Sequence, residues 1–294
     1  MLISNHDIWI LLIAALTAVS CALLGVFLTL RRMAMLGDAI SHSVLLSLAL
    51  GFLITGTRDL WIMWPSAILI GLLTAFLVQF LGQRGQVSED SAIGIGFTSF
   101  FALGVILISS FAGQVDLDQE CILYGEIALA PFDTITFAGQ EIGPRAFWNL
   151  LGVLSLVLMF SIGGFRQMRC ICFDPLLAQA IGLRLTWWHY GFMALVSVLV
   201  VSAFESVGTI LVIGMLVIPA NFAYLISKSL RIMLFLAPIF SITACLLGYL
   251  VARAWDLSIS ASIVSVMGCL FVITWLLVLL LRKCSKESSL IGNS

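Results

Sequence analysis

Apolar stretches long enough to cross a lipid bilayer follow one another through most of this 294-residue chain. About 20 consecutive apolar residues span the hydrocarbon core, because each helical residue advances the chain by about 1.5 Å. We predict nine such stretches: Ile8–Leu30, Leu36–Thr55, Ile62–Leu81, Ser91–Phe111, Ala146–Phe165, Tyr190–Phe204, Val207–Ile226, Ile232–Ala252 and Ala261–Leu281. This succession predicts an all-α, polytopic membrane protein with eight or nine transmembrane helices.

The sixth and seventh stretches decide between eight and nine crossings, since Glu205-Ser206-Val207-Gly208 interrupts one apolar segment. Cytoplasmic loops of membrane proteins carry an excess of lysine and arginine. With nine crossings and the N-terminus outside, eleven of the fourteen basic residues lie on the cytoplasmic side. Nine crossings are therefore preferred, and a short or re-entrant segment near Glu205 is the alternative.

Composition excludes several classes of protein. Hydrophobic residues make up 62% of the chain and charged residues only 10%, which is too little charge for the surface of a soluble domain. With a net charge of -1 there is no basic patch to bind nucleic acid. We expect one transmembrane domain over residues 1–281 and a short, polar, irregular cytoplasmic tail over 282–294.

Motifs of common enzymes are missing from the sequence. No G-x-x-x-x-G-K-[ST] loop occurs, so we do not expect this chain to bind and split ATP in that way. His-Glu-x-x-His and Gly-x-Ser-x-Gly are also missing, which leaves a membrane protease or lipase without support. The pair Cys170-x-Cys172 falls in a predicted cytoplasmic loop, and we interpret both thiols as reduced and structural.

Asp38 and His42 are the most informative polar residues, because they lie four apart in a predicted membrane helix. This spacing places both side chains on one face, and Ser41 lies on nearly the same face. Ionisable groups inside a membrane usually mark a pathway for ions or substrates, although a purely structural clasp is the alternative. A carboxylate and an imidazole can share one transition-metal ion, which makes Asp38 and His42 candidate metal ligands.

A second element, Asp174 to Leu183, predicts a short helix in a cytoplasmic loop. Asp174 suits the N-cap, Pro175 the first helical position and Gly182 the residue beyond the end. The helix is either a surface helix at the membrane boundary or a docking helix for a cytoplasmic partner. In the second case the contacts are Leu176, Leu177 and Ala180.

Two acids are candidates for the outer mouth of a pathway. Glu126 belongs to an acidic outer segment that could attract cations or contact an external protein, although a solvated loop is the simpler interpretation. Glu205 falls at an outer turn in the nine-crossing map, where a capping role and a ligand role are equally plausible.

Four stretches resemble the permease subunits of ABC importers for zinc, manganese and iron. They are Arg31-Arg32-Met33-Ala34-Met35-Leu36-Gly37-Asp38-Ala39-Ile40-Ser41-His42, Leu123-Tyr124-Gly125-Glu126-Ile127, Asp174 to Leu183, and Val207-Gly208-Thr209-Ile210-Leu211-Val212 through Pro219-Ala220. The resemblance implies a metal in transit at Asp38 and His42 and an ATPase bound at Asp174–Leu183. It also implies two ATPase subunits, an external metal-binding protein and a second permease copy or paralogue in a bacterial cytoplasmic membrane.

We therefore predict a permease that carries zinc, manganese or iron as substrate, holds no permanent cofactor and is not itself an enzyme. The main alternative is a proton-coupled secondary transporter in which Asp38 and His42 relay protons. A membrane enzyme that uses the pair as acid and base ranks last, because no third catalytic group is visible. Imidazole and carboxylate suit all three metals, so the sequence does not distinguish them.

Overall fold

The computed structural model describes residues 5–55, 60–84, 88–111, 127–137 and 140–291. Nine α-helices of 18 residues or more lie within these ranges and correspond to the nine predicted stretches. They are α1 (Asn5–Leu30), α2 (Ala34–Thr55), α3 (Leu60–Arg84), α4 (Glu89–Phe111), α6 (Arg145–Gly163), α9 (Leu185–Val207), α10 (Thr209–Ile226), α11 (Leu230–Trp255) and α12 (Ile259–Ile291). Eight helices, counted over the described residues, are long and apolar enough to cross a membrane. The predicted helical membrane fold is confirmed.

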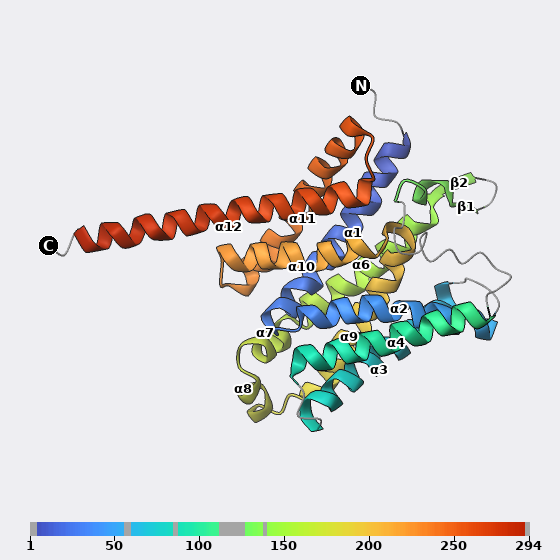
Figure 1. Cartoon of the computed structure of the whole chain (residues 1–294), viewed down its shortest axis with the longest axis horizontal. Coiled ribbons are helices and arrows are strands. Elements are labelled where there is room, and N and C mark those ends of the chain that lie inside the picture. The colour runs from blue at the N-terminus through green and yellow to red at the C-terminus, as the bar shows by residue number, and fades with distance from the viewer. Residues whose placement is uncertain (1–4, 56–59, 85–87, 112–126, 138–139, 292–294) are drawn as a thin grey trace.

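The short elements lie at the two ends of this bundle. They are η1 (Ala130–Phe132), β1 (Thr134–Phe137), β2 (Gln140–Pro144), α7 (Phe165–Phe173) and α8 (Pro175–Ala180). Figure 1 shows the N-terminus and the β1–β2 hairpin at one end, and α7, α8 and the C-terminus at the other. α1 begins at the first of these ends, and α12 extends beyond the second.

Gly208 separates the two stretches whose number of crossings was in question. Gly208 lies between the end of α9 and the start of α10. Its φ is 85° and its ψ is 159°, a backbone conformation that residues with a Cβ rarely adopt. α10 then continues to Ile226 with Pro219 in its interior. The segment therefore forms two separate helices rather than one.

Small residues allow the helices to approach closely. A Cβ added at Gly37 on α2 would lie 2.7 Å from Leu216 Cδ2 on α10, and one at Gly104 on α4 would lie 2.9 Å from the backbone nitrogen of Leu46 on α2. Helices in lipid associate through such close packing, because lipid is as apolar as their side chains. α2 is consequently enclosed by α3, α4, α9 and α10.

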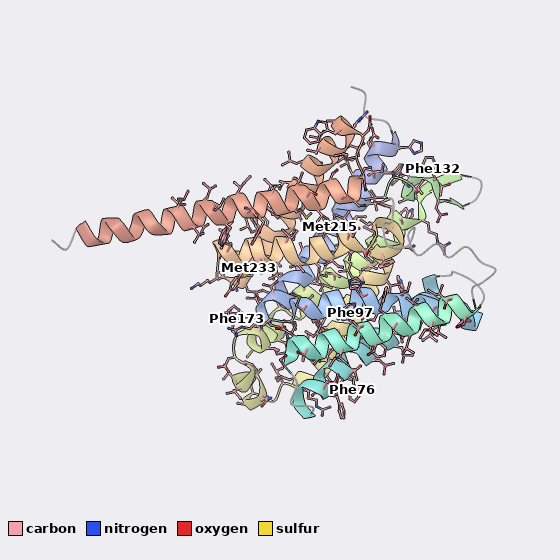
Figure 2. All side chains as sticks on the ribbon, viewed as in Figure 1. Phe76, Phe97, Phe132, Phe173, Met215 and Met233 are labelled. Carbon is pink, nitrogen blue, oxygen red and sulfur yellow. The ribbon has the colours of Figure 1, made fainter. Side chains whose placement is uncertain are left out.

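Large apolar side chains face outward as well as inward. Phe76 on α3 projects from the bundle and is 54% exposed, and Leu250 on α11 is 61% exposed (Figure 2). Several buried hydroxyls bond to their own helix, as when Thr17 Oγ1 donates to the Ile13 carbonyl across 2.9 Å. An apolar exterior with hydroxyls bonded inside the helices fits a multi-pass membrane protein.

Two local features differ from the sequence prediction. β1 and β2 form an antiparallel hairpin with an irregular register between Ile135 and Thr136, a pair of strands too short to predict from alternation. α12 continues to Ile291, so residues 282–291 are helical where we predicted irregular structure. Extending an existing helix needs no new nucleus, which explains why this polar sequence remains helical.

Candidate functional site

α2 is one continuous helix over the segment that contains Asp38 and His42, so the two residues lie one turn apart as predicted. The His42 ring lies 5.2 Å from the Phe97 ring and 6.2 Å from the Phe101 ring, measured between centroids. Both phenylalanines belong to α4, which packs along α2 (Figure 2). The His42 imidazole is therefore positioned between two helices and against two aromatic rings.

The side chains of Asp38, Ser41 and Glu205, and the whole of Glu126, lie outside the described residues. The prediction that Asp38 and His42 form a metal site thus stays a prediction. In the described part of the chain, no three His, Cys, Asp or Glu residues lie close enough together to hold a metal ion.

Ser43 and Thr74 fix α2 against α3 beside His42. Ser43 Oγ donates to the Ala39 carbonyl across 2.8 Å, and Thr74 Oγ1 on α3 lies 3.1 Å from the same Ser43 oxygen. Both side chains are fully buried. This contact joins α2 to α3 at the residue next to His42, a positioning role that the sequence analysis missed.

α8 has the local geometry predicted for Asp174 to Leu183. Asp174 Oδ1 accepts a hydrogen bond from the Leu177 N–H across 2.9 Å, Pro175 begins the helix, and Gly182 has a φ of 82°. Asp174 is therefore an N-cap, and its carboxylate stabilises the first turn.

Both leucines of α8 are exposed, and Leu177 also lines the cavity beside α7. Leu176 is 78% exposed and Leu177 is 52% exposed, whereas Ala178 is fully buried against the rest of the protein. Ala180 is exposed as well. A short helix that is anchored on one side and presents leucines on the other is a surface suited to a partner.

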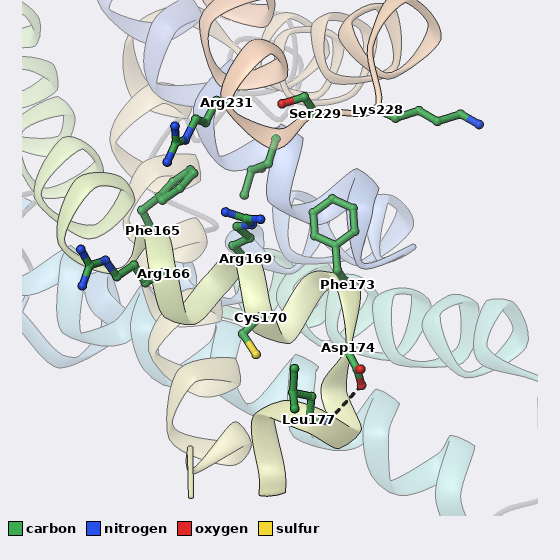
Figure 3. A pocket seen from close by; sticks show the side chains of 11 residues that line it. Phe165, Arg166, Arg169, Cys170, Phe173, Asp174, Leu177, Lys228, Ser229 and Arg231 are labelled. Atoms are coloured by element: carbon green, nitrogen blue, oxygen red, sulfur yellow. Dashed lines mark hydrogen bonds between the residues drawn. The ribbon is translucent and has the colours of Figure 1, made fainter. Parts of the chain in front are cut away.

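A cavity of about 840 Å³ opens between α7, the start of α8 and the turn that joins α10 to α11. Four of its lining residues are cations, namely Arg166, Arg169, Lys228 and Arg231, and one is the acid Asp174. Figure 3 shows these side chains around the cavity. The Arg231 guanidinium carbon lies 5.9 Å from the Phe165 ring centroid. The excess of positive charge makes this basic pocket complementary to an acidic surface.

The sequence analysis placed eleven basic residues on the cytoplasmic side, these four among them, but did not bring the four together. Lys228 and Arg231 follow α10 and lie about sixty residues after Arg166 and Arg169 in the chain. The turn lies next to α7 because α10, α11 and α7 all pack against α1. The only signal in the sequence was the number of basic residues in the cytoplasmic loops, which does not tell which of these residues lie close together.

Comparison with known proteins identifies the family. Residues 6–278 match the model of the ABC 3 transport family. The chain belongs to this family. The resemblance to metal ABC permeases that we drew from the sequence is therefore confirmed.

Two curated members are similar over most of their length. The manganese transport system membrane protein MntD of Bacillus subtilis (strain 168) is 43% identical over 264 residues, covering 90% of this chain and 89% of that protein. The zinc transport system membrane protein TroD of Treponema pallidum (strain Nichols) is 38% identical over 267 residues, covering 91% of this chain and 72% of that protein. PsaBC from Streptococcus pneumoniae, solved in complex with Fab, superposes with a TM-score of 0.77 and is 33% identical, covering 92% of this chain and 91% of that one.

Proposed function

We propose that this chain is the permease subunit of an ATP-driven importer for a divalent transition metal, with Mn²⁺ and Zn²⁺ as the leading substrates. Similar proteins are named for manganese and zinc transport, and carboxylate with imidazole suits both ions. α8 is the observation that carries this proposal. A capped helix with exposed leucines beside a basic pocket gives an ATPase subunit a place to bind.

In this proposal the metal crosses the membrane through a site formed by Asp38 and His42. The ion enters from the outer end, binds briefly between α2 and its neighbours, and leaves inward when the ATPases reset. Binding at such a site must be weak, because an ion that is held tightly does not leave. Phe97 and Phe101 restrict the orientation of the His42 ring and so define where its ligating nitrogen points.

The proposed partners follow from the two ends of the bundle. ATPase subunits bind α8 with Leu176 and Leu177, and an acidic part of their surface faces the basic pocket. An external metal-binding protein delivers the ion at the opposite end, where Glu126 and Glu205 are candidate mouth residues. A second permease completes the pathway. We also infer that the C-terminus is cytoplasmic, because α12 ends on the side of the bundle that carries α8 and the basic pocket.

The test is the metal content of cells that express the complete importer, measured for manganese, zinc and iron by elemental mass spectrometry. We expect wild type to raise one metal and both Asp38→Ala and His42→Ala to abolish the rise at unchanged protein level. His6→Ala, at the exposed start of α1, is the matched control and is expected to import normally.

Two outcomes contradict the proposal. If wild type raises no metal, the transport function is wrong, and if the two variants import normally, Asp38 and His42 are only a structural clasp. Uptake that persists when the ATPase partner is inactive, but collapses with the proton gradient, establishes the secondary transporter instead.

A further inference from the structure

Arg31 lies in a compact turn that joins α1 directly to the helix with Asp38 and His42. The backbone N–H of Arg31 donates to the Phe27 carbonyl across 3.1 Å, and the backbone N–H of Met33 donates to the Leu28 carbonyl across 2.9 Å. α2 begins at the next residue, Ala34. Only Arg32 and Met33 separate Arg31 from α2, so a displacement of Arg31 is passed on to the start of that helix.

His189 lies just beyond α8, one turn into α9. The segment that joins the two helices is hydrogen-bonded at both ends: the Leu183 N–H donates to the Ala178 carbonyl across 3.0 Å, and the Trp187 N–H donates to the Arg184 carbonyl across 3.1 Å. A movement imposed on α8 is therefore transmitted to the first turns of α9, where His189 lies.

The two segments meet in a direct contact between Arg31 and His189. Arg31 Nη2 donates to His189 Nδ1 across 2.8 Å, although 158 positions separate the residues in sequence. The guanidinium carbon also lies 5.8 Å from the ring centroid of Phe192, one turn further along α9. Since arginine has only donors, Nδ1 is the acceptor and the second ring nitrogen carries the proton.

Stability alone does not explain this pair. Arg31 Nη1 and His189 Nε2 are buried, and neither has a hydrogen-bond partner in the part of the chain that the structure describes. Buried donors without partners are costly, and two apolar side chains of similar shape would avoid that cost. The pair fixes the relative position of two segments, and its two unpartnered nitrogens carry a desolvation cost.

We propose that Arg31 and His189 are positioning residues that transmit the movement of α8 to the Asp38/His42 segment. This proposal rests on the proposed function, since it assigns a mechanical connection between the ATPase site and the metal pathway. The connection runs from α8 through the first turn of α9 to Arg31 and then into α2. Loss of the contact should leave ATP hydrolysis intact but separate it from transport.

The test uses the complete importer in proteoliposomes and measures ATP hydrolysis and metal uptake together. In His189→Leu, we expect the metal imported per ATP to fall about tenfold, because a hydrogen bond to a charged group is lost. In His189→Asn the side-chain oxygen can replace Nδ1 as acceptor, and we expect most of the ratio to return. Arg31→Met should match His189→Leu, and the double variant should be no worse than either single one.

Tyr190→Phe is the matched control. Tyr190 is the next residue on α9, and its hydroxyl lies 3.0 Å from Gln79 Oε1 on α3, so this variant removes a contact from the same turn to a different helix. We expect its ratio of metal to ATP to equal that of wild type. An equal loss in Tyr190→Phe would show a general effect of destabilising α9 and would overturn the proposal.

Further outcomes separate this inference from the proposed function. If wild type shows no ATP-dependent uptake, the proposed function has failed. If wild type imports metal and His189→Leu keeps the wild-type ratio, only the role of the pair is wrong. Additive losses in the double variant would also contradict a shared contact. If His189→Leu does not assemble, Arg31→Met decides the matter, because it removes the same hydrogen bond from the other side.

Discussion

Asp7 and Arg253 form an ion pair that joins the first turn of α1 to the last turn of α11. Arg253 Nη1 donates to Asp7 Oδ2 across 2.9 Å; the Arg253 side chain is 34% exposed and the Asp7 side chain 17% exposed. The residues lie 246 positions apart in the sequence. α1 passes through the middle of the bundle, so this pair fixes its end to a peripheral helix.

Removal of either charge should destabilise the bundle slightly. We expect Asp7→Asn and Arg253→Gln each to reduce the free energy of unfolding by roughly 0.5–1 kcal/mol, because partly exposed pairs contribute little. Thermal unfolding in detergent, followed by tryptophan fluorescence, measures the effect. The double variant should lose no more free energy of unfolding than one single variant. Asp256→Asn is the control, because Asp256 is exposed and has a left-handed backbone conformation that asparagine tolerates.

Phe97 should control how well His42 binds the transported ion. In Phe97→Ala the ring at 5.2 Å is lost, and the imidazole gains orientations that do not bind metal. An aromatic contact contributes about 0.5–1.5 kcal/mol, so we expect the half-saturating metal concentration for uptake to rise about two- to tenfold.

Phe97→Tyr keeps the ring and is expected to import normally. Phe100→Leu, on the same helix, serves as the control. Among the described residues, the ring contacts of His42 on α4 are with Phe97 and Phe101 and not with Phe100. A normal half-saturating concentration in Phe97→Ala would show that the ring does not orient His42.

The N-cap of α8 should be needed for binding of the ATPase. α8 has six residues, too few to be helical in isolation, and Asp174 Oδ1 secures its first turn. Asp174→Ala removes about 1 kcal/mol of capping energy, so we expect weaker co-purification of the ATPase subunit and lower uptake. Asp174→Ser retains a capping oxygen and should retain both properties. An equal loss in the serine variant would mean that the charge of Asp174, rather than the cap, matters.

The Cys172 thiol should be unreactive at neutral pH. Burial raises its pKa to about 11, although the nearby Arg31 guanidinium acts in the opposite direction. Only about one thiol in a thousand is then ionised at pH 8, and the thiolate is the reactive form. In single-cysteine variants, alkylation of Cys172 by iodoacetamide should be slow at pH 8 and accelerate up to about pH 11.

Cys170, two residues before Cys172 in the chain, lines the basic pocket and provides the comparison. We expect iodoacetamide to label Cys170 faster than Cys172 at pH 8. Arg31→Met should slow the labelling of Cys172 further, because the neighbouring positive charge favours the thiolate. A rate for Cys172 that stops rising near pH 9 would contradict the raised pKa.

The sequence by itself determined the features that depend on neighbouring residues. The length of each apolar stretch predicted nine helices, because a helix in lipid must satisfy its own backbone. Asp174, Pro175 and Gly182 predicted both ends of α8, since capping is a local interaction. The spacing of Asp38 and His42 placed them one turn apart for the same reason.

Only the tertiary structure decided which helices touch. It placed Phe97 against His42, Arg31 against His189, and the turn with Lys228 and Arg231 beside α7. These residues are far apart in the chain, and apolar helices in lipid carry no clear polar face that would indicate their neighbours. Contacts of this kind depend on the close fit of small residues such as Gly37 and Gly104 between particular helices, and a fit between two surfaces exists only once both have been folded.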